Sequence, residues 1–380
     1  MRSSERGLSA VRAAAAGRVA ASVVVAALAV AACGGQVVPP SGSQVAPASA
    51  PVSASPASPA TVGAGLSAAP SGPSSATAGG AASADPSGGT PSPAPRMLGA
   101  VTATLLRVQL PSPLSRAVVG AQGSAVLVMG GLGSAGTTAS ILRIDPGAGT
   151  VARAGRLANA VHDAAGASLQ GLWLVIGGGR TVAAAVVQQV STTGSAVIAT
   201  DVGALPAARA DGAAVSVDGR VLVVGGGRGG VPDSAVLATS DGVHFTRIGR
   251  LAVPVRYGAV AAIGGAVYVF GGSTTRGDTD AIQRIDPATG AVQVVGRLPR
   301  PVSEAAAFVL DGRALIAGGM HAGRPATDIL AFDPATRHVV AVGRLPEPVA
   351  DAGAAVIGTT AYLVGGETGT VYLSSVIEIR

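Results

Sequence analysis

Six polar side chains recur at a nearly constant interval in the later part of this 380-residue chain. They lie 46 to 48 residues apart, and each lies 14 residues before a Gly-Gly pair. These six residues are Arg116, Asp163, Asp211, Tyr257, Glu304 and Asp351. Carboxylates accept hydrogen bonds from hydroxyl groups, and guanidinium groups bind carboxylates in a forked geometry. The interval predicts one polar position in each of six repeats. The residue types predict a mixed-charge pocket that could hold a sugar or an anionic group.

Further charged side chains surround these six positions. Their close neighbours in the sequence include His162, Arg209 and Arg256. The residues that follow the Gly-Gly pairs add Arg180, Arg228, Arg276, His321, Arg324 and Glu367. We take the His and Arg residues of both groups as further candidates for ligand binding. The alternative is that they are solvated rim residues that pair across neighbouring repeats.

The repeat that positions these side chains is marked by its glycines. The first glycine of each pair is residue 130, 177, 225, 271, 318 or 365. Each repeat contains short strand-like runs separated by turn signals. In the fifth repeat these runs are 305–310, 314–317, 328–332 and 339–342. Four strands in 46 to 48 residues are typical of a propeller blade.

Three short motifs within the repeat resemble a known family. They are Gly-Arg-Leu-Pro at 296–299, Asp-Gly-Arg-Ala-Leu-Ile-Ala-Gly-Gly at 311–319 and Asp-Pro-Ala-Thr at 333–336. Together they resemble the kelch motif, although Val replaces the aromatic residue that usually follows the Asp-Pro turn. The resemblance implies an all-β fold, a six-bladed kelch-type β-propeller formed by residues 97–380. It also implies that the loops entering the first strands share a binding face with those joining the second and third strands.

The closure of the ring can be predicted from the two ends of the repeat array. The last repeat contains only three strand-like runs and ends with 376–379. The segment 102–108 precedes the first repeat and has no other place in the pattern. We expect this N-terminal strand to complete the last blade, because a missing strand would leave exposed sheet edges at the seam.

The N-terminal segment has the features of a targeting signal. Residues 1–32 combine Arg residues with a short apolar run, which is typical of a signal peptide. Small residues before Cys33 resemble the lipobox of bacterial lipoproteins, which implies lipidation of Cys33 and anchoring to the cell membrane on its extracytoplasmic side. The alternative is an ordinary secretory signal with an incidental cysteine. Residues 33–96 are rich in Ala, Pro, Ser and Gly, and we expect a disordered tether there.

Composition excludes several classes of function. All 26 basic residues are Arg, and residues 33–380 carry 22 of them against 19 acidic residues. This excess is too small and too dispersed for a nucleic-acid-binding protein. Cys33 is the only cysteine, which excludes kelch-type copper oxidases with a Tyr–Cys crosslink. The four His residues show no metal-ligand spacing and no phosphate-binding loop occurs, so neither a metal nor a cofactor is expected.

Two functions remain compatible with the sequence. We expect a monomeric binding or scaffold module that recognises a protein or a carbohydrate at the cell envelope. The alternative is a sugar-converting enzyme similar to the sialic-acid mutarotases, which are six-bladed kelch proteins. In that case the analogy implies Glu304 as the acid and base, with Arg276 and Arg324 binding the carboxylate of the substrate.

Overall fold

The computed structural model describes residues 99–193 and 196–380. The predicted signal peptide 1–32, Cys33 and the tether 33–96 lie outside these residues. The described residues form strands, turns and loops, with no helix among them. Accordingly, none of them belongs to a helix able to span a bilayer.

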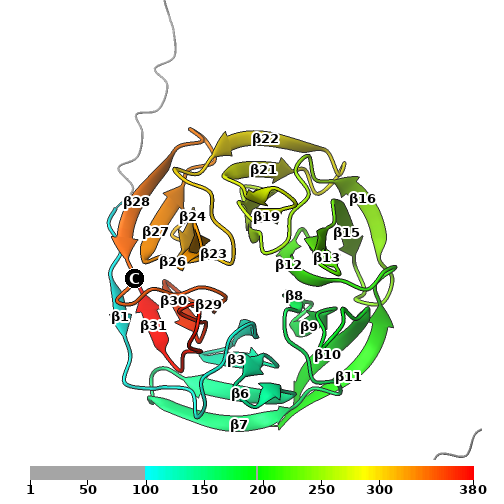
Figure 1. Cartoon of the computed structure of the whole chain (residues 1–380). Helices are drawn as coiled ribbons and strands as arrows, with labels where there is room; N and C mark the ends of the chain where they lie inside the picture. Colours follow the sequence, from blue (N-terminus) through cyan, green and yellow to red (C-terminus); the bar gives the residue numbers. More distant parts are fainter. Residues whose placement is uncertain (1–98, 194–195) are drawn as a thin grey trace, which may run out of the picture. The chain divides into compact units, whose positions relative to one another are not determined.

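The strands form small antiparallel sheets in a propeller-like arrangement (Figure 1). The sheet that joins the two ends of the array contains β1 (Ala103–Leu105), β31 (Val376–Ile379), β30 (Thr360–Val364) and β29 (Gly353–Ile357). Three further sheets have their four main strands in chain order. They are β12 (Ala210–Val217), β13 (Arg220–Arg228), β15 (Ala235–Thr239) and β16 (Thr246–Arg250); β17 (Ala259–Ile263), β18 (Ala266–Phe270), β21 (Ala281–Ile285) and β22 (Val292–Arg297); and β23 (Ala306–Leu310), β24 (Arg313–Ala317), β27 (Asp328–Phe332) and β28 (Val339–Arg344).

One larger sheet consists of two such four-stranded units. The first contains β2 (Val118–Gln122), β3 (Ala125–Met129), β6 (Ser140–Asp145) and β7 (Thr150–Arg156). The second contains β8 (Ala165–Leu169), β9 (Leu172–Ile176), β10 (Val186–Thr193) and β11 (Ala196–Ala204). The two units join where β11 pairs with β7 in parallel.

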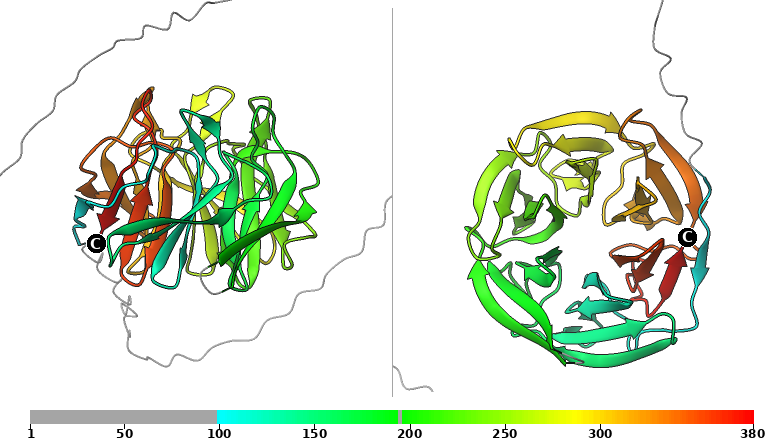
Figure 2. Two further views of the ribbon diagram at one scale, coloured as in Figure 1. Left: turned by 90° about the horizontal axis from the view of Figure 1, so that it is seen from below. Right: turned by 180° about the vertical axis from the view of Figure 1, so that it is seen from behind.

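Short hairpin strands follow several of the second strands of these units, and they lie at one end of the sheets (Figure 2). They are β4 (Leu132–Gly133), β5 (Gly136–Thr137), β14 (Val231–Pro232), β19 (Ser273–Thr274), β20 (Gly277–Asp278), β25 (Met320–His321) and β26 (Arg324–Pro325). In Figure 1, β8, β12, β23 and β29 surround the central axis, whereas β7, β11, β16, β22 and β28 form the outer rim.

The core lies between neighbouring sheets. The second strands β3 and β18 are buried along their whole length, because both faces of the sheet are covered by the adjacent sheets. Ala, Val, Leu and Ile supply most of this core, as the composition predicts. Trp173 on β9 instead packs against Gly120 on β2 and donates a hydrogen bond from Nε1 to the Ala121 carbonyl at 3.0 Å.

The Gly-Gly pairs join neighbouring units. The second glycine of each pair donates its N–H to a carbonyl of the following unit, at 2.7 to 2.9 Å. Gly319, for example, donates to Val349, and Gly366 at the end of the array donates to Leu114 near its start. Gly318 has φ of +65°, and a Cβ there would collide with the Val349 carbonyl. A side chain at this position is therefore excluded both by backbone conformation and by space.

The two ends of the array meet in one sheet. β1 pairs with β31 in antiparallel register, with Ala103 opposite Ile379 and Leu105 opposite Ile377. β1 lies within the segment 102–108, for which the sequence predicts this place. The pairing covers an edge that β31 would otherwise expose.

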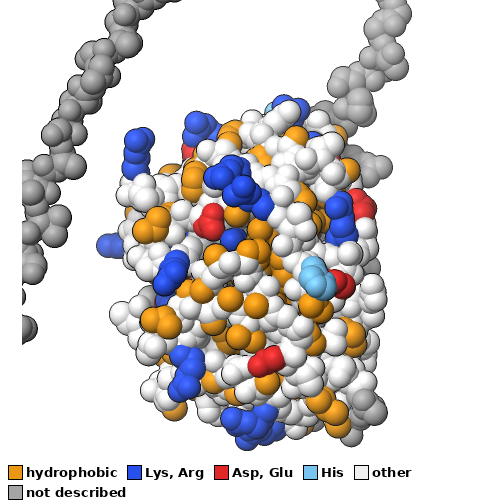
Figure 3. All heavy atoms as spheres, turned by 90° about the vertical axis from the view of Figure 1, so that its right-hand side faces the viewer, with side chains coloured by type: hydrophobic (Ala, Val, Ile, Leu, Met, Phe, Trp, Pro, Cys, Tyr) orange, Lys and Arg blue, Asp and Glu red, His pale blue; other side chains and the backbone are white. Residues whose placement is uncertain are grey.

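The outer face of the array carries isolated charges. Figure 3 shows arginine side chains scattered among apolar and neutral ones, with few acidic groups beside them. On the side of the molecule that Figure 3 shows, the basic side chains are therefore dispersed and do not gather into one patch.

Candidate functional site

The six recurrent polar residues form a closed ring at the central axis, and we call their places the ring positions. All six have φ between +51° and +61°, which is the left-handed region. Each N–H donates a hydrogen bond to the carbonyl of the preceding ring residue, at 2.8 to 3.2 Å. The last of these bonds runs from Arg116 to Asp351 and closes the circle at 3.0 Å. The left-handed conformation is costly for residues other than Gly, and the cyclic set of hydrogen bonds helps to offset that cost.

The six side chains line one cavity of about 160 Å³. Ala and Gly residues follow every ring position and complete its wall. Beyond them the axis continues into a space of about 180 Å³ lined by Ala, Gly and Val. This second space has no ionisable group in its lining, so the ionisable groups of these two spaces lie in the first, which we call the mouth of the channel. The sequence left open whether the six ring residues converge, and the structure places all six around one cavity.

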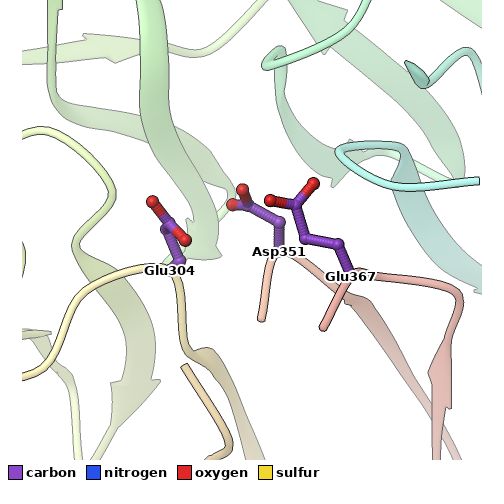
Figure 4. Close-up of side chains that lie close together, drawn as sticks. All are labelled: Glu304, Asp351 and Glu367. Carbon is purple, nitrogen blue, oxygen red and sulfur yellow. The ribbon is translucent and has the colours of Figure 1, made fainter. Parts of the chain in front are cut away.

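Three carboxylates are close together on one side of this mouth, and we call them the acid side. They are Glu304, Asp351 and Glu367, and one oxygen of each lies within 4.8 Å of those of the other two (Figure 4). Glu304 and Asp351 are ring residues, whereas Glu367 follows the last Gly-Gly pair. Oxygen ligands of this kind suit hard cations such as Ca²⁺, although the sequence spacing predicts no metal site.

Arg116 is the cation that faces the acid side. Its Nε lies 3.1 Å from Oδ2 of Asp351, and its terminal nitrogens lie 3.5 Å from Asp163 and 3.5 Å from Glu367. Nε of Arg116 and Oδ2 of Asp351 are both buried, and neither forms a hydrogen bond within the described part of the chain. Their contact is an ion pair without hydrogen-bond alignment. One guanidinium group thus serves three carboxylates and leaves one of them incompletely satisfied.

Burial shifts the proton equilibria of these acids upward. It raises the pKa of Asp351 well above its ordinary value, to which Glu304 adds while Arg116 opposes. Burial also raises the pKa of Glu304, again against the effect of Arg116. The pKa of Asp163 rises to about 7, through burial, with Arg116 opposing the shift and Asp211 adding to it. Asp351, Glu304 and Asp163 therefore retain protons at a pH where exposed carboxyl groups are ionised.

The opposite side of the mouth carries arginines, and we call Arg180, Arg228 and Arg256 the arginine side. These residues line a second cavity of about 530 Å³, together with His162 and Gly230. Asp163, Asp211 and Tyr257 line both cavities, so the two spaces adjoin.

Arg256 is held in place by two ring residues. Its Nε donates to Oδ2 of Asp211 at 2.7 Å, and one terminal nitrogen donates to the Tyr257 hydroxyl at 3.1 Å. Its guanidinium carbon also lies 4.9 Å from the centre of the Tyr257 ring. Asp211 therefore has a cation of its own, unlike the carboxylates of the acid side.

His162 lies between the two sides. Its Nδ1 is 2.9 Å from the Thr137 hydroxyl, and its Nε2 is 3.5 Å from Oδ2 of Asp163. Burial lowers the pKa of His162, and the charge of Arg116 lowers it further. The imidazole is therefore a weaker base than an exposed histidine.

Four predicted site residues lie away from both cavities. Arg209 is buried and donates to the Gly225 carbonyl at 3.0 Å and to Asp233 at 3.1 Å. Its guanidinium group therefore stabilises the local fold and does not face either cavity. Arg276 is exposed in the turn between β19 and β20. His321 and Arg324 line a separate pocket of about 330 Å³ beside Asp328.

The expected arrangement, in which Arg276 and Arg324 lie beside Glu304 and bind the carboxylate of a substrate, is wrong. Arg276 and Arg324 do not line the cavity that contains Glu304. Arginine side chains are long, and a position just after a Gly-Gly pair does not fix the direction in which they extend. Arg116 is instead the guanidinium group whose charge acts on Glu304.

Comparison with known proteins shows the fold and no more. No family model matches the sequence, and no curated protein matches it either. Among solved structures, the chain is similar to the one titled "Structure of YjhT", with a TM-score of 0.61 and 16% sequence identity. The match covers 72% of this chain and 99% of the other. At this identity, the similarity supports the propeller-like fold alone.

Proposed function

We propose that this protein is a six-bladed kelch-type propeller that acts as a binding or scaffold module at the bacterial cell envelope. The six-fold sequence repeat, the six ring positions and the four-stranded units support the blade count. The lipobox-like sequence at Cys33 supports a lipid anchor on the extracytoplasmic side of the membrane. The ligand in this proposal is a protein or a carbohydrate, and the module acts as a monomer.

The observation that carries a binding function is the convergence of ring side chains on one cavity. A channel through a purely structural ring could be lined by Ala, Gly and Val alone, as it is just below the mouth. At the mouth, five of the six ring residues are instead charged and the sixth is Tyr257. Concave sites with a few converging polar groups are typical of ligand binding.

The test is a binding screen with the full chain, using a glycan array and a pull-down from envelope extracts. The double variant Asp163→Asn and Asp211→Asn should lose the captured ligand, because both residues line both cavities. The matched control Arg247→Ala removes an exposed charge from β16 and should bind normally. Equal capture by wild type and the double variant would contradict binding at the mouth.

A second candidate is a mutarotase-type sugar isomerase, favoured by one observation. Glu304 and Asp163 have raised pKa values and face the same guanidinium group, Arg116. A carboxyl group with a pKa of about 7, as Asp163 has, suits general acid–base catalysis near neutral pH. The test is anomer exchange followed by NMR on neutral and acidic sugars. Turnover that falls at least tenfold in Glu304→Gln would support the enzyme, and no acceleration by wild type would exclude it for those sugars.

A further inference from the structure

The two cavities at the mouth adjoin, and the acid side and the arginine side lie at different ends of the combined space. On the acid side, Glu304 and Asp351 line the first cavity and Glu367 lies close to both, whereas the arginine side borders the second cavity. Asp163, Asp211 and Tyr257 belong to both walls, so one small molecule can reach both sides. Within the described residues, Arg116 is the cation that contacts the acid side.

The acid side has an unfilled requirement for positive charge. The Asp351 side chain is 9% exposed, and its buried Oδ2 accepts no hydrogen bond from the described residues. Glu304 faces the same space and forms no ion pair or side-chain hydrogen bond within the described part of the chain. Arg116 already approaches Asp351, Asp163 and Glu367. A cationic group with several N–H donors would supply the hydrogen bonds that this single guanidinium does not.

The arginine side has free donors for an anion. Arg180 and Arg228 are exposed and pair with no carboxylate among residues 99–193 and 196–380. Arg256 uses Nε and one terminal nitrogen for Asp211 and Tyr257, which leaves its other terminal nitrogen available. A Cβ on Gly230 would lie 3.6 Å from that nitrogen, which is ordinary van der Waals contact.

We propose that the mouth binds a zwitterionic group, with its ammonium end at the acid side and its anionic end at the arginine side. This inference rests on the binding function proposed above and specifies the chemistry of the ligand. Opposite charges on one small group match the two sides at once, whereas an anion alone would face three carboxylates and a cation alone would leave the arginines without a partner.

The test uses short ω-amino acids as probes and isothermal titration calorimetry of the full chain in low salt at pH 8. Glycine, 4-aminobutyrate and 6-aminohexanoate vary the distance between the charges. Butylamine and butyrate carry one charge each, and CaCl₂ tests an inorganic cation. We expect at least one amino acid to bind tenfold or more tightly than either singly charged probe.

Two variants separate the two ends of the probe. Glu367→Gln should weaken binding of the best amino acid about tenfold and leave butyrate binding unchanged. Arg228→Ala should weaken the same amino acid to a similar degree and leave butylamine binding unchanged. The controls Asp311→Asn and Arg247→Ala remove exposed charges far from the mouth and should leave all affinities unchanged.

Three results would overturn the inference. The first is that no amino acid binds more tightly than the better singly charged probe. The second is that each variant weakens both singly charged probes equally. The third is tight Ca²⁺ binding that no amino acid displaces, which would indicate a metal site. If a glycan or protein is still captured in these cases, only the zwitterion is wrong; if nothing binds, the proposed function fails as well.

Discussion

The acid side and the arginine side lie around the same mouth but differ in how their charges are satisfied. On the arginine side, Asp211 has Arg256 as its own partner, and the remaining guanidinium groups extend into solvent. On the acid side, Asp351 and Glu367 share Arg116, and Glu304 has no ion-pair partner among the described residues. Identical backbone positions thus give different electrostatics, because burial and the number of cations are set by the side chains. The acid side should therefore respond to pH and mutation more than the arginine side.

The largest expected effect comes from removing the shared cation. Arg116→Met should destabilise the protein by about 3–5 kcal/mol at pH 8, because it leaves buried carboxylates unpaired. At pH 4 the loss should be much smaller, since the raised pKa values of Asp163 and Asp351 keep these two partners of Arg116 protonated. Denaturant unfolding at both pH values measures this.

The matched change on the other side sharpens the contrast. Arg228→Met removes an exposed guanidinium group and should alter stability by no more than about 0.5 kcal/mol. If the two methionine variants were equally destabilised, the difference between the sides would not be electrostatic.

The second effect concerns the pH dependence of stability. The pKa of Asp163 is raised from 3.8 to about 7, so the folded state binds this proton more tightly than the unfolded state. Its contribution is fully present below pH 3.8 and is lost as the pH rises through about 7. Asp163→Asn should remove this contribution, which for a shift of about three pKa units is on the order of 4 kcal/mol between pH 4 and 8. Arg116, Asp211 and His162 face this carboxyl group, and the difference between variant and wild type isolates it from them.

A third and smaller effect tests the support of the arginine side. Tyr257→Phe removes the hydroxyl that accepts a hydrogen bond from Arg256. The loss should be about 1 kcal/mol. It should be the same at pH 5 and pH 8, because Arg256 stays charged and the pKa of Tyr257 is raised by burial. A loss that changes with pH would show that Tyr257 is coupled to the carboxylates instead.

The smallest effect is expected at Glu304. This carboxylate is half-buried and forms no ion pair within the described residues, so Glu304→Gln removes a charge that burial disfavours. Stability at pH 8 should rise by about 0.5 kcal/mol, with no change at pH 4. Thermal unfolding at the two pH values measures the difference, and destabilisation at pH 8 would reveal a missing partner for this group.

Much of the fold could be predicted because the turn motifs recur along the sequence together with the strand-like runs. In the fifth repeat the predicted runs 305–310 and 328–332 correspond to β23 and β27, with one residue of difference at the start of β23. The Asp-Pro turns behave as their residues predict: Oδ1 of Asp286 accepts hydrogen bonds from the N–H groups of Ala288 and Thr289, both at 3.0 Å. Local chemistry of this kind is visible in a sequence.

The ring was also predictable, because residues at one place in every repeat meet around the axis. The directions of long side chains were not, as Arg209 and Arg324 show. Glu367 also follows a Gly-Gly pair, but this position alone does not predict a ligand-binding residue. Its signal lay in a comparison of repeats: the equivalent positions hold Leu132, Gly179, Gly227, Ser273 and Met320, so the last repeat alone has an acid there. Burial, which raises the pKa values, depends on packing between units and cannot be read from spacing.

The closed circle of backbone hydrogen bonds at the ring positions has a consequence for the evolution of the mouth. A circle of this kind sets a fixed aperture, because widening it at one point strains its other bonds. Selectivity must then change through the side chains it displays. Each ring position can accept different residues that tolerate a left-handed backbone, such as Asn, Asp or Gly, and disfavours β-branched ones. Relatives of this protein could therefore bind different ligands on an unchanged frame.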